Sequence, residues 1–175
     1  TDLRSYFHKS FSFEGVVVDT HYGSPTSDFH LSDQTMKMFK HYRRTSSKQA
    51  IPYARIQNHL RQFAHDSQCF ERVKAIELKY NMTIDILVRM RDNAIVAEPF
   101  DVIKTMDLVK HRKVIVKRCN CWGGYSDKVW IIPRRYIEAT MAHVVNDTLA
   151  AERFLLRNPP SNSEQLIKTV WNHYG

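Results

Sequence analysis

The sequence predicts an α/β fold in which helices flank a mixed sheet. Short apolar runs bounded by turn residues alternate along the chain with longer stretches whose apolar residues recur at helical spacing. Such an alternation is typical of an α/β sandwich. The 175 residues, 43% hydrophobic and 25% charged, fit one globular domain with a substantial core. We therefore treat residues 1–175 as a single domain.

The N-terminal part of the chain supplies one expected strand and one loop. Residues 16–18 form a short apolar run that leads into a turn-rich loop over residues 19–28. Ligands of α/β sheets gather beyond the carboxyl ends of strands, so Asp19 and His21 are expected near a site, although loop aspartates more often form turns. Because the chain begins with Thr1 rather than methionine, we expect its N-terminus to be truncated.

The clearest helix is predicted over residues 53–80, directly after Pro52. Its apolar residues recur at helical spacing, with charges on the opposite side: Ile56, Leu60, Phe63, Phe70, Val73 and Leu78. This stripe is typical of a helix packed against a sheet. A second, weaker helix is expected over residues 32–42.

The second half of the chain is expected to continue the alternation. Strands are predicted over residues 84–88, 114–117 and 128–133, and helices over residues 134–149 and at the C-terminus. Ser161 and Glu164 fit the S-x-x-E capping box at the start of the final helix.

The net charge of +8 implies an acidic partner. Nucleic acid, an anionic membrane surface and a phosphate-bearing small substrate all fit this charge. No apolar run approaches the roughly 20 residues that span a bilayer, and no signal peptide is visible. Sequons at Asn81 and Asn146 would matter only in a secreted protein, so the compartment stays open.

A glycine pair, Gly123 and Gly124, stands out in a chain that has five glycines. Glycine suits a sharp turn or a close approach of the backbone to another group. The pair therefore marks a plain turn, a zinc knuckle with Cys119 and Cys121, or the floor of a binding site. Zinc is disfavoured, because the C-x-C pair has no second Cys or His pair at zinc-finger spacing.

A charged cluster ends the predicted strand at residues 84–88. Strand alternation sends Arg89 and Arg91 to the same side, and Asp92 and Asn93 follow directly. Oxygen ligands of this kind bind Mg²⁺ or Mn²⁺, and arginines donate forked hydrogen bonds to phosphate. The alternative is a surface ion pair between Arg91 and Asp92.

Three segments carry a resemblance to a known family: "YNMTIDILVRMRDNAIVAEPF", "VIVKRCNCWGGYSDKVWIIPRRYIEATM" and "NSEQLIKTVWNHYG". In order and spacing they resemble the R-x-R-x-D, W-G-G-x-x-D-[KR] and S-E-x-[FL] motifs of the glycosyltransferase-like proteins of algae, fungi, bacteria and large viruses. The helix before the first motif is similar as well. The resemblance runs from Tyr53 to Gly175.

The resemblance implies a GT-A-like sandwich with a mixed, mainly parallel sheet flanked by helices, which binds a nucleotide-diphosphate sugar. By similarity, Arg89, Arg91, Asp92 and Asn93 would face the donor diphosphate, and Asp92 would hold Mn²⁺ or Mg²⁺. Asn93 stands where many relatives have a second aspartate, which puts strict metal dependence in doubt.

The same resemblance implies an acceptor side. Trp122 would form a wall for a sugar ring, and Gly123 and Gly124 would let the backbone approach that sugar. Asp127 would be the carboxylate that takes the acceptor proton in an inverting reaction. Glu164 is the rival base, unless it only completes the helix cap with Ser161.

Two other functions compete with sugar transfer. Asp66 with Glu77 and Lys79 imitates the D…E-x-K core of metal-dependent nucleases, but that core needs E-x-K on a strand, whereas Glu77 falls in the predicted helix. The other is a basic protein that binds nucleic acid or a glycan without turnover. For the transferase, we expect a nucleotide sugar and a glycan acceptor as partners, and no nucleic acid.

Overall fold

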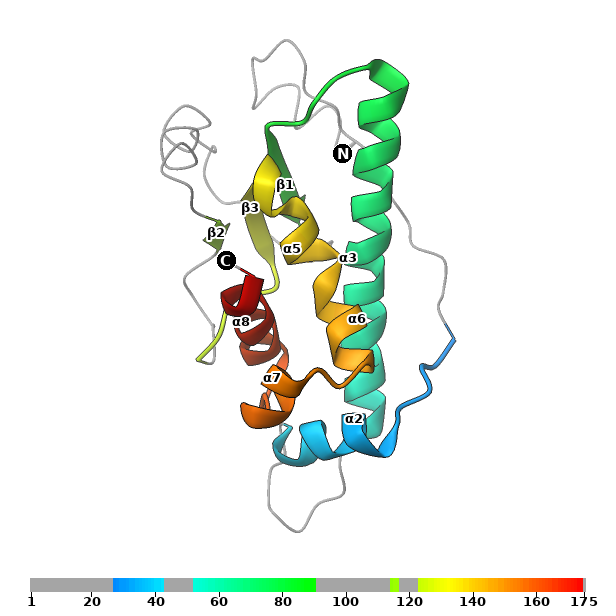
Figure 1. Cartoon of the computed structure of the whole chain (residues 1–175), viewed down its shortest axis with the longest axis vertical. Helices are drawn as coiled ribbons and strands as arrows, with labels where there is room; N and C mark the ends of the chain where they lie inside the picture. Colours follow the sequence, from blue (N-terminus) through cyan, green and yellow to red (C-terminus); the bar gives the residue numbers. More distant parts are fainter. Residues whose placement is uncertain (1–26, 43–51, 91–113, 117–122, 175) are drawn as a thin grey trace, which may run out of the picture.

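The computed structural model describes residues 27–42, 52–90, 114–116 and 123–174. Its elements follow the chain in this order: α2 (Asp33–Met38), η1 (Phe39–His41), α3 (Tyr53–Tyr80), β1 (Ile86–Met90), β2 (Ile115–Val116), β3 (Val129–Pro133), η2 (Arg134–Tyr136), α5 (Ile137–Met141), α6 (His143–Leu149), α7 (Arg153–Arg157) and α8 (Ser163–Tyr174). The described residues thus combine helices with a small sheet, as the α/β class requires (Figure 1).

The described sheet has the strand order β1-β3-β2, and both pairings are antiparallel. The expectation of a mainly parallel sheet is therefore wrong for the described strands. Apolar periodicity shows which residues are buried but not which way a neighbouring strand runs, so the sequence had no signal for direction. In the β1–β3 pair, Arg89 lies opposite Trp130 and Met90 opposite Val129.

Helix α3 confirms the predicted helix, because it spans the 28 residues expected of it. Its apolar stripe packs mainly against α5 and α6 rather than a sheet, and Leu78 is 86% exposed, so the predicted place of Leu78 in the stripe is wrong. The helix begins directly after Pro52 and ends at Asn81, whose left-handed backbone (φ 48°) is a common helix stop. Near its end, Glu77 accepts hydrogen bonds from Arg134 and from the backbone of Ile84, which ties α3 to both strands of the β1–β3 pair at one end, where Ile86 lies opposite Pro133. No helix in the described ranges has the length and apolar character to cross a bilayer.

The helix predicted over residues 134–149 is broken into η2, α5 and α6. No glycine or proline occurs within the break at Ala142. Thr140 donates its hydroxyl proton to the backbone carbonyl of Tyr136, 2.7 Å away, one helical turn earlier. Such back-bonding competes with the helix ladder and bends helices, which gives a local reason for the break.

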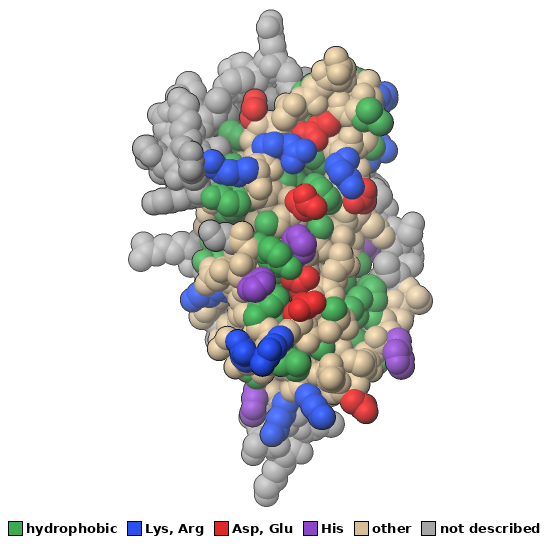
Figure 2. Space-filling model, viewed as in Figure 1, with side chains coloured by type: hydrophobic (Ala, Val, Ile, Leu, Met, Phe, Trp, Pro, Cys, Tyr) green, Lys and Arg blue, Asp and Glu red, His purple; other side chains and the backbone are tan. Residues whose placement is uncertain are grey.

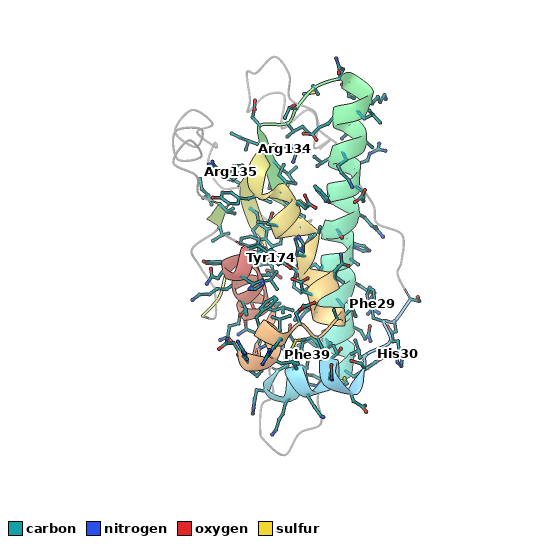
Figure 3. All side chains as sticks on the ribbon, viewed as in Figure 1. Phe29, His30, Phe39, Arg134, Arg135 and Tyr174 are labelled. Carbon is teal, nitrogen blue, oxygen red and sulfur yellow. The ribbon has the colours of Figure 1, made fainter. Side chains whose placement is uncertain are left out.

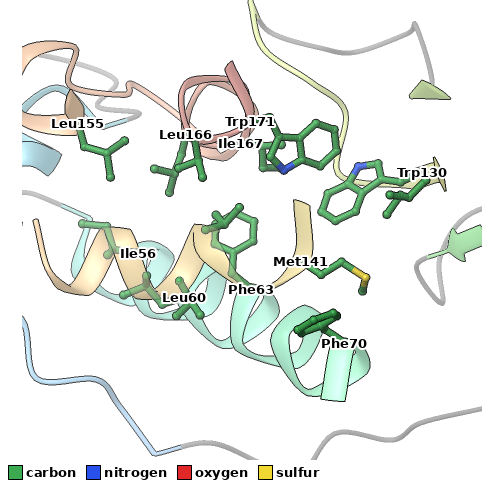
Figure 4. Packing of buried hydrophobic residues seen from close by; sticks show 14 of the residues in the cluster. Ile56, Leu60, Phe63, Phe70, Trp130, Met141, Leu155, Leu166, Ile167 and Trp171 are labelled. Atoms are coloured by element: carbon green, nitrogen blue, oxygen red, sulfur yellow. The ribbon is translucent and has the colours of Figure 1, made fainter. Parts of the chain in front are cut away.

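The core lies between α3 on one side and α5, α6 and α8 on the other (Figure 4). Ile56, Leu60 and Phe63 of α3 face Leu166 and Ile167 of α8 across this layer. The ring centroids of Trp130 and Trp171 are 4.9 Å apart at 74°, an edge-to-face contact that joins β3 to α8.

One corner, where α6 meets the end of α8, carries a buried acid outside this core. Asp147 is 7% exposed; its Oδ1 lies 3.7 Å from Nδ1 of His143, and its Oδ2 has no hydrogen-bond partner among the described residues. The ring of Tyr174, labelled in Figure 3, stacks on the ring of His143 with centroids 4.0 Å apart. Burial raises the pKa of Asp147 above its ordinary 3.8, while Tyr174 and His143 act in the opposite direction.

Candidate acceptor-side site

Three segments that the sequence keeps far apart meet at one place in the fold: the end of β1, residues 123–127, and the start of α8. The β1–β3 register sets Met90 opposite Val129, so the carboxyl end of β1 lies beside the chain that leads from Asp127 into β3. Arg89 donates a hydrogen bond from Nη1 to the backbone carbonyl of Asp127. The backbone of Tyr125 in turn donates to the carbonyl of Glu164, at 2.9 Å.

Arg89 is the centre of a buried polar network. Its Nε and Nη2 donate to the two carboxylate oxygens of Asp66 at 2.8 and 3.1 Å, in forked geometry. The side chains of Arg89 and Asp66 are 9% and 7% exposed. The guanidinium also lies over the Trp130 ring, 4.4 Å from its centroid.

The Arg89 interactions bear on its expected role at the diphosphate. Three of the five N–H groups of a guanidinium are already used by Asp66 and by the Asp127 carbonyl. We therefore give Arg89 a positioning role, in which it joins α3 to the backbone of Asp127. The diphosphate contact implied by the resemblance stays a prediction.

Asp127 is held by α3 as well as by β1. It is 7% exposed, and Nε2 of Gln62 donates to its Oδ2 at 3.3 Å. Gln62 and Asp66 stand four residues apart, which places them on one face of α3. Asp66 acts on the Asp127 backbone through Arg89, while Gln62 contacts the carboxylate directly, so one helix face orients this acid.

The glycine pair has a structural explanation that the sequence did not reveal. A Cβ on Gly124 would lie 2.0 Å from the backbone carbonyl carbon and oxygen of Glu164, so only glycine fits there without a shift. Gly123 has φ +82°, a conformation that favours glycine, and lies against the side chain of Gln165. The close approach in the structure is therefore to helix α8, and a contact with a sugar stays a prediction.

Glu164 does not complete the cap of α8, so the expected pairing with Ser161 is wrong. Asn162 accepts from the backbone of Gln165 at 2.8 Å, and Gln165 accepts from the Ser161 backbone at 3.0 Å. The cap thus runs one residue later than S-x-x-E predicts. Glu164 is buried, with 7% exposure, and accepts a hydrogen bond from Ser163 at 3.0 Å, whereas the Ser161 backbone donates to Gln165.

Several expected site residues lie outside the described ranges: Asp19, His21, Arg91, Asp92, Asn93, Cys119, Cys121 and Trp122. The donor side and the zinc alternative therefore stay predictions. Within the described ranges, no group of three or more His, Cys, Asp or Glu side chains could hold a metal ion. The structure does not form the acidic cluster that the nuclease alternative requires. Asp66 and Glu77 both lie on α3, separated by a rise of about 16 Å, and each binds a different arginine.

Sequence reasoning missed Gln62 and gave Asp66 a different role. Asp66 had a readable signal: it lies three residues after Phe63 and four before Phe70, on the apolar face of the helix, where a solvated acid is not expected. Gln62 had no such signal in the sequence.

No protein-family model, curated protein or solved structure matches this chain.

Proposed function

We propose that this protein is a glycosyltransferase that moves a sugar from a nucleotide-diphosphate sugar to a hydroxyl acceptor, with inversion. One observation supports this most directly: the R-x-R, W-G-G-x-x-D and S-E-x-L segments, separated by tens of residues in the chain, converge at Arg89, Asp127 and Glu164. A resemblance without functional meaning would not require these three segments to meet. The proposal includes a GT-A-like architecture, of which the described sheet and its helices would be one part.

Asp127 would act as the general base. A carboxylate oxygen takes the proton of the acceptor hydroxyl while the acceptor oxygen forms its bond to the anomeric carbon. The bond from that carbon to the diphosphate oxygen breaks, and its electron pair leaves with the diphosphate. Gln62 and Arg89 keep the carboxylate and its backbone in place during the transfer, which limits the reorganisation that the reaction requires.

Glu164 is the second candidate for the base. It is buried, its carboxylate accepts a hydrogen bond from Ser163, and its backbone contacts the glycine turn that leads to Asp127. On the donor side, Arg91, Asp92 and Asn93 would face the diphosphate, and Asp92 would hold Mn²⁺ or Mg²⁺, which neutralises the departing charge when bound. The proton transfer to Asp127 and its positioning by Gln62 and Arg89 do not depend on that cation.

Donor binding can be tested before any acceptor is known. The thermal midpoint should rise when the protein is mixed with the matching nucleotide sugar and Mn²⁺ or Mg²⁺. Saturation at 100 times Kd stabilises a protein by about 2.7 kcal/mol, or roughly 5–11 °C for a domain of this size. Asp92→Ala should abolish most of this shift, and the nucleoside without its diphosphate should produce little of it.

A panel of uridine, guanosine, cytidine and adenosine diphosphate sugars that leaves the midpoint unchanged at millimolar concentration, with either metal, would contradict the proposed function. Stabilisation by any oligonucleotide, lost steeply as salt rises, would instead favour the nucleic-acid-binding alternative.

A further inference from the structure

Five basic side chains form an exposed surface at one end of the molecule, and none of them belongs to the site described above. We call Lys37, Lys40, His41, Arg153 and Arg157 the basic face. Lys37 belongs to α2, Lys40 and His41 to η1, and the two arginines to α7; all five are exposed. Figure 2 shows Lys and Arg side chains gathered over α7 and α2 at this end.

The basic face rests on a rigid base. Helix α2 packs against α7, and Thr35 donates its hydroxyl proton to the backbone carbonyl of Leu149, 3.3 Å away at the end of α6. Met38, Phe39 and Leu155 anchor the two elements in the core, each with 1% exposure or less. The charges are therefore carried by elements that are fixed in position relative to each other.

The cations of the basic face lack the ion pairs that several other cations of this chain form. Arg61, Lys74 and Arg134 each bind a carboxylate: Asp28, Glu71 and Glu77 respectively. Within the described ranges, Lys37, Lys40, Arg153 and Arg157 form no ion pair with any acid. Four like charges on one surface repel each other, and a bound anion would relieve that repulsion.

The helix dipole does not account for the whole set either. Lys37 and Arg157 lie in last turns, where a positive charge is favourable. Arg153, in contrast, is the first residue of α7, where the dipole favours an acid. The helix dipole therefore does not account for the position of Arg153.

The surroundings of the basic face favour an extended acidic chain. A membrane partner would gain affinity from apolar side chains that insert, but the one large exposed hydrophobic residue on these described elements is Leu156, at 36%. Single-stranded nucleic acid would require exposed rings for stacking. Here Phe39 is buried and Phe154 stacks on His173 with centroids 4.0 Å apart. An acidic polysaccharide needs only spaced cations, and arginine binds carboxylate or sulfate with a forked pair of donors.

The position of the basic face links it to the candidate site. Helix α7 packs against α8 and directly precedes it in the chain. The backbone at the start of α8, at Glu164, contacts Gly124 and Tyr125, which lead to Asp127. A chain bound along α7 would thus extend toward the place where an acceptor hydroxyl would be deprotonated.

We propose that the basic face binds an acidic polysaccharide, and that this chain carries the acceptor hydroxyl. The second half of the statement rests on the proposed function, whereas the binding itself does not. The polymer is recognised through its repeated carboxylate or sulfate groups rather than through one sugar.

Binding can be measured with polygalacturonate as the probe and neutral dextran as its uncharged counterpart. The variant K37Q/K40Q/R153Q/R157Q should bind polygalacturonate at least about tenfold more weakly at low salt, and the slope of log K against log salt should fall by roughly two to four. The matched control R72Q/K74Q/K79Q/R135Q also removes two lysines and two arginines, from the opposite end of the molecule. Figure 3 shows Arg135 at that end, far from Phe39 of η1.

The outcomes separate the alternatives. An equal loss in both quadruple variants means that overall charge, not this surface, drives binding, and it overturns the proposal. Tighter binding to duplex DNA or to vesicles with 30% phosphatidylserine, dependent on the same four residues, also overturns it, because the partner class is then different. Unchanged circular dichroism and thermal midpoints show that the variants fold. Polygalacturonate binding that depends on these residues, in a protein that transfers no sugar, supports the surface and contradicts the proposed function.

Discussion

Two buried aspartates, Asp66 and Asp147, show opposite ways of keeping a carboxylate away from water. Asp66 is 5% exposed, and both of its oxygens accept hydrogen bonds from Arg89. Asp147 is 7% exposed, lies 3.7 Å from His143 through one oxygen, and has no partner on the other among the described residues. A buried polar group that lacks a partner costs free energy, and one that is fully paired specifies a unique arrangement.

The comparison of the two acids indicates where the fold holds a carboxylate in one fixed position. The paired acid lies beside Asp127, where the network of Gln62, Asp66 and Arg89 keeps one carboxylate and its backbone in place. Asp147, which is paired through only one oxygen with His143, lies where α6 meets the end of α8.

The largest expected effect comes from breaking the paired acid. Asp66→Asn leaves the Arg89 charge buried and uncompensated, so the free energy of unfolding should fall by about 3–5 kcal/mol in urea titrations. Asp28→Asn is the matched control, because it breaks the exposed pair with Arg61 and should cost less than about 1 kcal/mol. Similar small losses of unfolding free energy in both variants would show that the buried pair of Asp66 and Arg89 contributes no more to stability than the exposed pair.

The next effect tests the glycine turn that brings Asp127 to α8. Gly124→Ala forces the backbone of Glu164 to move, so we expect a loss on the order of 3 kcal/mol. Gly123→Ala meets only the end of the Gln165 side chain and should cost about 1–2 kcal/mol, for its left-handed φ. If the Gly123 variant proved the less stable of the two, that result would contradict the close contact between Gly124 and the backbone of Glu164.

The smallest effect concerns Asp147 and is read from its pH dependence. Burial raises its folded pKa above 3.8, so the folded state binds the proton more tightly than the unfolded state. This contribution to stability is fully present below pH 3.8 and is lost as the pH rises through the folded pKa. Relative to Asp147→Asn, the wild type should therefore lose stability over that window.

The charged and titratable groups facing Asp147 are His143 on α6, Glu152 before α7, and Tyr174 on α8. Thermal midpoints measured from pH 3 to pH 7 for the wild type, Asp147→Asn and Glu138→Gln, an exposed acid on α5, give the comparison. A difference between the wild type and Asp147→Asn that does not change with pH would contradict the assigned direction.

The sequence predicted the elements better than their arrangement. Helix α3 was predicted over its full length, because its apolar stripe and the preceding Pro52 are local signals. The α8 cap was misplaced by one residue, since S-x-x-E and N-x-x-Q overlap in "SNSEQ" and both suit a capping box. Strand direction and the contact between Gly124 and Glu164 depend on distant partners, which no local pattern encodes.

The candidate site was predicted in its parts. Asp127, Glu164 and the glycine pair were named from their motifs, and the structure brings their segments together. The support from α3 was not predicted, because Asp66 and Arg89 are 23 residues apart and no spacing rule links a helix acid to a strand arginine.

The central claim is that the carboxylate of Asp127 takes the acceptor proton in a sugar transfer. The most direct measurement is the rate of transfer by the wild type, Asp127→Asn and Glu164→Gln, with the nucleotide sugar and acceptor identified by the binding screens. Asp127→Asn should lose at least about a hundredfold in kcat with unchanged nucleotide affinity, while Glu164→Gln retains most of the activity. Normal transfer by Asp127→Asn, with donor binding intact, would contradict the account and would move the base to another residue.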